Sequence, residues 1–226
     1  MKGDDQAAKA AFDKARTLRP GDPMALRNLA ALAIKQKKFD EANGYYEEIL
    51  KNNPKDSATY LSLAEMEARA GKPNETETTL RTAMKENPDD PAPRIALARL
   101  LLLQGKGKEA LDTVQPSLTK YPKNPSLLDV VGRAQLAMNN PTAAISTFNT
   151  LVAEAPKSSP AHEDLAEAYG ASNNIELALT EARTAVALDP KNENAQLTLV
   201  RLLANHHDYG EAGTLLASLR DRKSVV

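Results

Sequence analysis

Apolar residues recur along this chain at helical spacing, and the whole pattern repeats every 34 residues. With each 34-residue repeat numbered from 1, position 7 holds a large apolar residue six times: Leu29, Leu63, Leu97, Val131, Leu165 and Leu199. Position 8 is small in five repeats: Ala30, Ala64, Ala98, Gly132 and Ala166. A second small position, 20, holds Ala8, Ala42, Ala110, Ala144, Ala178 and Ala212. The pattern predicts two helices per repeat, helix A and helix B, which approach closely through their small residues.

Prolines at the same 34-residue interval set the register: Pro20, Pro54, Pro88, Pro122, Pro156 and Pro190. With these prolines at position 32, six complete repeats follow one another without insertion: 23–56, 57–90, 91–124, 125–158, 159–192 and 193–226. Residues 1–22 form the second half of a further repeat, helix B only, with Gly3 at the turn before it. Repeat 193–226 is degenerate, because Val200 is bulky at position 8 and Ser224 replaces the proline. We expect one continuous domain cut from a longer array.

Residues that begin and end helices occupy fixed positions in the repeat. Position 34 carries side chains that can cap the first turn of helix A: Asp22, Asp56, Asp90, Asn124, Ser158 and Asn192. Position 15 carries residues that tolerate the left-handed conformation: Gly71, Gly105, Asn139 and Asn173. The proline at position 32 disfavours helix in the residue before it and therefore ends helix B.

The 34-residue period, the small residues at positions 8 and 20 and the proline at position 32 resemble the tetratricopeptide repeat family. The resemblance covers essentially the whole chain. It departs from the family at position 4, where only Tyr60 keeps the aromatic residue. The family implies an all-α fold, a right-handed superhelical solenoid of helix-turn-helix repeats with a concave groove for a protein or peptide partner.

In this family, helix A lines the groove, and the resemblance implies these candidate residues: Arg27, Lys35, Leu61, Glu65, Arg69, Ile95, Arg99, Leu102, Leu103, Arg133, Leu136, Glu167 and Arg201. In one interpretation the apolar members form the floor of a partner site and the arginines meet acidic groups of the partner. In the other, the charges form a solvated ladder of ion pairs, with Glu65 beside Arg99 and with Glu167 between Arg133 and Arg201. The sequence leaves both open.

Composition and motifs narrow the class of function. Lys plus Arg number 29 and Asp plus Glu number 30, so no basic field favours nucleic acid. The chain has no Cys, no apolar run long enough to span a membrane, and no phosphate-binding loop, nucleophile elbow or zinc-protease motif. The His206-His207-Asp208 cluster is a poor metal site because adjacent side chains rarely converge on one ion. We expect no enzyme activity, no cofactor and no metal.

These observations predict a soluble protein-interaction scaffold. The "ALDPKN" and "ENPDDP" junctions resemble bacterial arrays of exopolysaccharide export and PEP-CTERM sorting, which implies a role in envelope assembly. The compartment stays open between the bacterial envelope, including the periplasm, and the cytoplasm. Alternatives are a substrate-recruiting or regulatory segment of a larger enzyme, or a module that self-associates through an exposed terminal helix bearing Leu215, Leu216 and Leu219.

Overall fold

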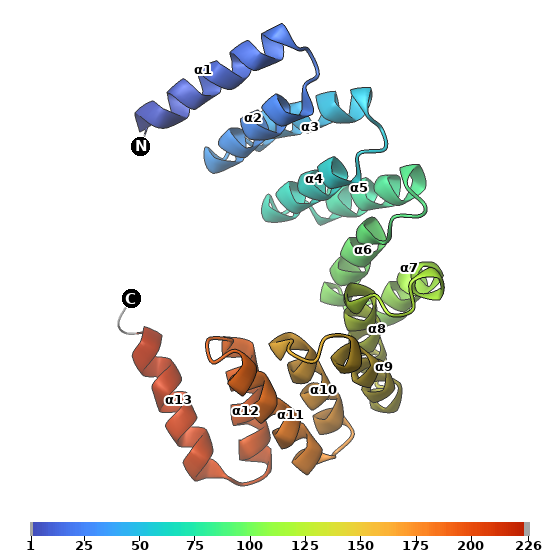
Figure 1. Ribbon diagram of the computed structural model, residues 1–226, viewed down its shortest axis with the longest axis vertical. Coiled ribbons are helices and arrows are strands. Elements are labelled where there is room, and N and C mark those ends of the chain that lie inside the picture. The colour runs from blue at the N-terminus through green and yellow to red at the C-terminus, as the bar shows by residue number, and fades with distance from the viewer. Residues whose placement is uncertain (1, 224–226) are drawn as a thin grey trace. The chain divides into compact units, whose positions relative to one another are not determined.

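The computed structural model describes residues 2–223, which form thirteen helices and no strand (Figure 1). The helices are α1 (Lys2–Leu18), α2 (Pro23–Lys35), α3 (Phe39–Asn52), α4 (Ser57–Arg69), α5 (Pro73–Glu86), α6 (Pro91–Leu103), α7 (Gly107–Lys120), α8 (Pro125–Ala137), α9 (Pro141–Glu154), α10 (Ser159–Ala171), α11 (Ile175–Leu188), α12 (Glu193–Asn205) and α13 (Tyr209–Lys223). The all-α prediction is confirmed. None of the helices described is both long enough and apolar enough to cross a bilayer.

The chain divides into two compact units, Met1–Leu97 and Ala98–Val226, and α6 contributes residues to both. From α1 to α5, and again from α7 to α13, each helix packs against the next one along the chain. In the second unit the A helices α8 and α10 also pack against each other, as do α10 and α12. Three A helices therefore lie side by side there and present one continuous surface.

The residues at position 34 cap helix A as predicted. Asp22 accepts a hydrogen bond from the Ala25 backbone N–H at 3.1 Å, and Asp56 accepts one from Thr59 at 3.1 Å. The side chains of Asp90, Asn124, Ser158 and Asn192 accept equivalent bonds from the first turns of α6, α8, α10 and α12. Six helix starts are thus set by one recurring local interaction.

The left-handed conformation at position 15 occurs in more repeats than the sequence predicts. Positive φ angles occur at the predicted glycines and asparagines, and also at Lys37 (59°) and His207 (68°). A left-handed lysine or histidine is strained because its Cβ crowds the following carbonyl, so packing of the two helices imposes this turn. The prediction for Gly3 is wrong: α1 begins at Lys2, so Gly3 lies inside the helix and not in a turn.

Helix B ends two residues before each proline, as the residue pattern predicts. The residue between the helix and the proline is extended, with φ of −139° at Asn53 and −133° at Asn87. Two of the polar residues that replace the aromatic at position 4, His162 and Gln196, contact the proline carbonyl of the preceding repeat. His162 Nε2 lies 3.1 Å from the Pro156 oxygen, and Gln196 donates to the Pro190 oxygen at 2.7 Å. These two departures from the family pattern therefore have a structural role.

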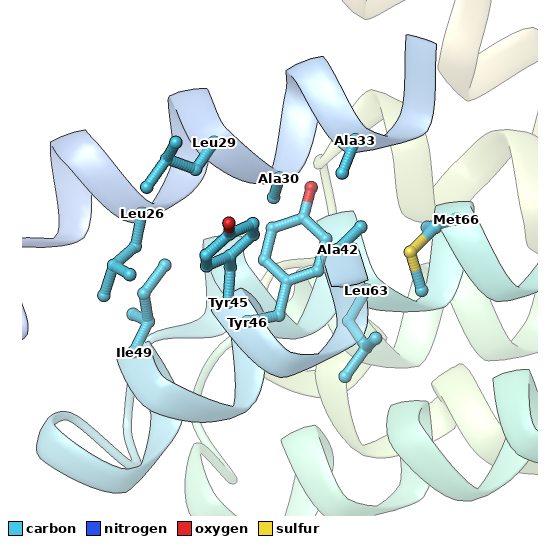
Figure 2. Packing of buried hydrophobic residues seen from close by; sticks show 10 residues of the cluster. All are labelled: Leu26, Leu29, Ala30, Ala33, Ala42, Tyr45, Tyr46, Ile49, Leu63 and Met66. Atoms are coloured by element: carbon cyan, nitrogen blue, oxygen red, sulfur yellow. The ribbon is translucent and has the colours of Figure 1, made fainter. Parts of the chain in front are cut away.

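The core of the first unit forms where α2 and α3 meet, and Figure 2 shows it from nearby. Tyr46 lies between Ala30 and Ala33 of α2 on one side and Leu63 of α4 on the other. Ala30 and Ala42 are fully buried, so the small residues at positions 8 and 20 lie inside the core as the sequence predicts. Their size leaves room for the larger residue at position 24, here Tyr46.

The second unit repeats this arrangement with a stricter fit between Gly132 and Phe148. Phe148, at position 24 of its repeat, is fully buried. A Cβ added at Gly132 would meet a ring carbon of Phe148 at 2.3 Å, closer than real contacts allow. The aromatic ring at position 24 is therefore matched here by glycine, the smallest residue, at position 8.

The terminal helix differs from the sequence expectation. We expected Leu215, Leu216 and Leu219 of α13 to form an exposed apolar end. Leu216 is 51% exposed, but Leu219 is only 7% exposed and Leu215 packs against the core of the second unit. Leu215 and Leu219 are turned inward because α13 packs against α12 along its own apolar face.

We predict that Gly132→Ala lowers the free energy of unfolding by about 1–3 kcal/mol, because the new methyl overpacks the site against Phe148. Gly44 is the matched control: it lies in α3 with nothing within 4 Å of the place that a new methyl would take, so Gly44→Ala gains about 0.5–1 kcal/mol from helix propensity. Urea unfolding followed by circular dichroism measures both. A Gly132→Ala protein as stable as the Gly44→Ala protein contradicts the prediction.

Candidate functional site

An open hollow of about 640 Å³ lies on the A-helix surface of the second unit. We call it the leucine hollow, and it is lined by Arg99, Leu102, Leu103, Asp129, Arg133, Leu136, Ala137 and Glu167. These residues come from the end of α6, from α8 and from α10, all on helix A. Six of the predicted groove residues in this unit are thereby brought to one place: Arg99, Leu102, Leu103, Arg133, Leu136 and Glu167.

The apolar part of the hollow comes from positions 12 and 13 of adjacent repeats. Leu103 is 88% exposed, and Leu102 and Leu136 are half-buried beside it. An exposed leucine costs free energy in water, and covering one stabilises a complex by roughly 1.5–3 kcal/mol. The hollow therefore offers a partner an apolar contact that the chain itself does not cover.

Ion pairs tie each A helix of this surface to the next. Arg99 of α6 lies 2.9 Å from Asp129 of α8, and Arg133 of α8 lies 2.6 Å from Asp164 of α10. Arg133 also contacts Asp129, one turn before it on the same helix, at 2.5 Å. Two arginines and two carboxylates thus form a continuous chain across three helices.

The chain of charges extends to α12 through a weaker contact. Arg201 lies 3.4 Å from Glu167 of α10, as the ladder interpretation expects. Glu163, on the same face of α10, accepts a hydrogen bond from Asn192 at 3.3 Å, and burial raises its pKa. Exposed pairs of this kind contribute little stability individually, so their main effect is to orient the arginines.

Asp164 differs from the other carboxylates because it is only 2% exposed. Burial raises the pKa of Asp164 to about 8, in spite of the opposing attraction of Arg133, and the neighbouring carboxylates of Asp129, Glu167 and Glu163 add to the rise. An ion pair with one buried member is sensitive to its protonation state. The Arg133–Asp164 contact is therefore the titratable element of this surface.

The predicted groove residues of the first unit also carry partners. Arg27 pairs with Asp56 and donates to Thr59, and Lys35 lies 2.8 Å from Asp5. Glu65 pairs with Arg69 on its own helix at 2.5 Å, whereas the ladder interpretation placed it beside Arg99. Leu61 is half-buried.

Ile95, predicted as part of the apolar floor, is only 8% exposed and belongs mainly to the core. Sequence reasoning also left Asp129 and Asp164 out of the site. The spacing of Asp129 and Arg133, four residues apart on one helix, was a usable signal for the first. No local signal marks Asp164, because its partner lies in the preceding repeat.

The described residues contain no group of three or more His, Asp or Glu side chains placed to hold a metal ion. His206 lies 3.0 Å from Glu176 and 2.9 Å from Asp208, and these carboxylates raise its pKa. The cluster is exposed and its charges are paired within it. Its geometry is that of a surface ion pair.

Helix pairs stacked along the chain, with an uncovered A-helix surface, define a helical-repeat protein of the solenoid class. Models of the tetratricopeptide repeat match residues 1–66, 67–134 and 132–193. These matches span most of the sequence, and the chain belongs to the tetratricopeptide repeat family. No curated protein sequence matches it.

Several solved structures share the fold. MamA (41-end) from Desulfovibrio magneticus RS-1 superposes with a TM-score of 0.62 at 20% identity, covering 75% of this chain and 96% of that one. PilF from Pseudomonas aeruginosa gives 0.69 at 16% identity, covering 93% of each chain. YrrB, described as a tetratricopeptide protein with an unusual peptide-binding site, gives 0.59 at 18%, covering 82% and 95%. At these identities the likeness concerns the fold alone.

We predict that the free energy of unfolding falls as pH rises from about 4 to about 8, because folded Asp164 keeps a proton that the unfolded chain releases. In the Asp164→Asn protein the free energy of unfolding is expected to decrease less over this pH range, since the amide does not titrate. Urea unfolding at a series of pH values measures the slope.

Asp112 provides the control for this measurement, because it is exposed and pairs with Lys108 on its own helix. The Asp112→Asn protein is expected to keep the wild-type slope. If the free energy of unfolding changes with pH equally in the Asp164→Asn and wild-type proteins, folded Asp164 does not have a raised pKa.

Proposed function

We propose that this chain is a protein-interaction module that holds a segment of a partner protein against the leucine hollow. The observation that carries the proposal is the 88% exposure of Leu103 beside Leu102 and Leu136 in a hollow of about 640 Å³. Contiguous apolar surface that a folded chain leaves uncovered marks interaction sites. Tetratricopeptide repeat proteins typically act as scaffolds for protein–protein interaction, which supports the same conclusion.

The rim of the hollow suggests how a partner is oriented. Arg99 and Arg133 both contact Asp129, and Arg133 also contacts Asp164, so both guanidinium groups already have partners within the chain. We therefore assign the arginines first to the ion-pair ladder, and the apolar contact to the partner. An amphipathic segment with leucine-like anchors fits this division, because its apolar side chains enter the hollow and its polar side faces water.

We expect peptides selected by display against the wild-type protein to lose at least about tenfold in affinity for the Leu103→Asp and Leu136→Asp proteins, since a charge replaces the apolar contact. Leu177 is the matched control: it is 50% exposed on the B helix α11, outside the hollow. Isothermal titration calorimetry measures the affinities. Equal losses for Leu177→Asp, or no loss at the hollow, contradict the proposal.

We also propose that the partner belongs to a bacterial envelope assembly, namely an exopolysaccharide-export or protein-sorting system, because the "ALDPKN" and "ENPDDP" junctions resemble arrays of those systems. This proposal rests on a resemblance between short junction sequences and on no contact in the structure, so the test is the position of the gene in the genome. We expect the gene to lie beside polysaccharide-synthesis or sorting genes. A heat-shock or cell-division neighbourhood contradicts this assignment and leaves the role of the leucine hollow untouched.

A further inference from the structure

A second cavity, of about 270 Å³, opens in the first compact unit between α3 and α5, with residues of α4 between them. Phe39 and Met66 contribute apolar surface to it, and Figure 2 shows Met66 at the edge of the core. Its charged lining residues are Asp40, Glu47, Glu67, Lys72 and Glu75, and we call it the acidic crevice. It lies within residues 39–75, so it shares no residue with the leucine hollow.

Glu67 is the unusual member of this set. It is 8% exposed, and one carboxylate oxygen, Oε1, accepts a hydrogen bond from Thr79 at 3.1 Å. The other oxygen, Oε2, is buried and has no hydrogen-bond partner among the described residues. Burial raises the pKa of Glu67, and Glu75 adds to the rise. A buried carboxylate oxygen without a partner is costly, which calls for an explanation.

The fourth repeat shows what this position needs for folding. Gln135 occupies the place of Glu67, and Thr147 that of Thr79, and the same bond forms between them at 2.8 Å. A neutral amide therefore satisfies the structural contact from helix A to helix B. The negative charge of Glu67 is not required for that contact, so it is available for another purpose.

The charges around the crevice are unbalanced. Four carboxylates line it against one ammonium, and Lys72 approaches Asp40 only at 3.9 Å. The oxygens do not converge as metal ligands, since no set of three or more ligating side chains occurs among the described residues. The excess of negative charge beside apolar surface suits an organic cation with a methylene stem.

We propose that the acidic crevice binds the side chain of a lysine presented by a partner protein, with its ammonium donating to Glu67 Oε2 and its stem lying against Phe39 and Met66. Lysine fits better than arginine because Thr79 already occupies one oxygen of Glu67. A single free oxygen suits a compact ammonium, whereas a guanidinium gains most from two. This site goes beyond the proposed function, because it gives the chain a second contact of different chemistry.

The test is a titration of the ¹⁵N-labelled chain with Nα-acetyl-lysine methylamide, followed by amide chemical shifts at low ionic strength. Nα-acetyl-norleucine methylamide is the matched probe without charge, and Nα-acetyl-arginine methylamide tests the choice of cation. We expect saturable shifts confined to residues of α3, α4 and α5, and binding of the lysine probe about tenfold tighter than that of either other probe.

Glu67→Gln is expected to weaken the lysine probe by about tenfold while keeping the fold, since Gln135 already occupies the equivalent place. Glu86→Gln, on α5 and outside the crevice, makes the same change of charge and is expected to keep wild-type affinity. Ala70→Leu narrows the crevice without touching the carboxylate and is expected to weaken binding as well.

Three results would overturn the proposal: equal binding of the lysine and norleucine probes, tighter binding of the arginine probe, or equal effects of Glu67→Gln and Glu86→Gln. Shifts spread evenly over acidic residues of both units, or no saturable shift at all, would also reject it. The leucine hollow is unaffected by any of these outcomes, because it is tested with different variants and ligands.

Discussion

The close approach of helix A and helix B through small side chains is the constraint on which the rest of this structure depends. Ala30 and Ala42 are fully buried where α2 meets α3, and Gly132 leaves room for the ring of Phe148 where α8 meets α9. Small residues bring the two helices together, and the larger residue at position 24 fills what remains. The left-handed turn at position 15 follows from this packing, since even Lys37 adopts it.

Packing of this kind leaves the opposite face of helix A uncovered, and that face supplies the candidate site. In the second unit α8 packs against α10 and α10 against α12, so side chains at the same positions of successive repeats become neighbours. Arg201–Glu167 joins position 9 of adjacent repeats, whereas Arg99–Asp129 and Arg133–Asp164 join position 9 of one repeat to position 5 or 6 of the next. They hold a polar frame around Leu103, whose exposure a partner can remove.

The two proposed contacts use different physical effects. The leucine hollow offers apolar area framed by charges that are already paired, so its contribution depends on the surface buried. The acidic crevice offers an unpaired oxygen of Glu67 in a site with excess negative charge, so its contribution depends on a matching cation. A partner with an apolar segment and a separate lysine would use both.

The sequence by itself determined the repeat, the helix ends and the small residues of the core, because each of these depends on neighbours a few positions away. Asp22 caps the helix that begins beside it, and the residue before each proline is extended for a steric reason within two residues. Only the tertiary structure decided which groove residues have partners. Ile95 is buried, Leu219 is turned inward, and Asp164 meets Arg133 from the preceding repeat. These outcomes depend on contacts between different helices, whose side-chain directions no local pattern specifies.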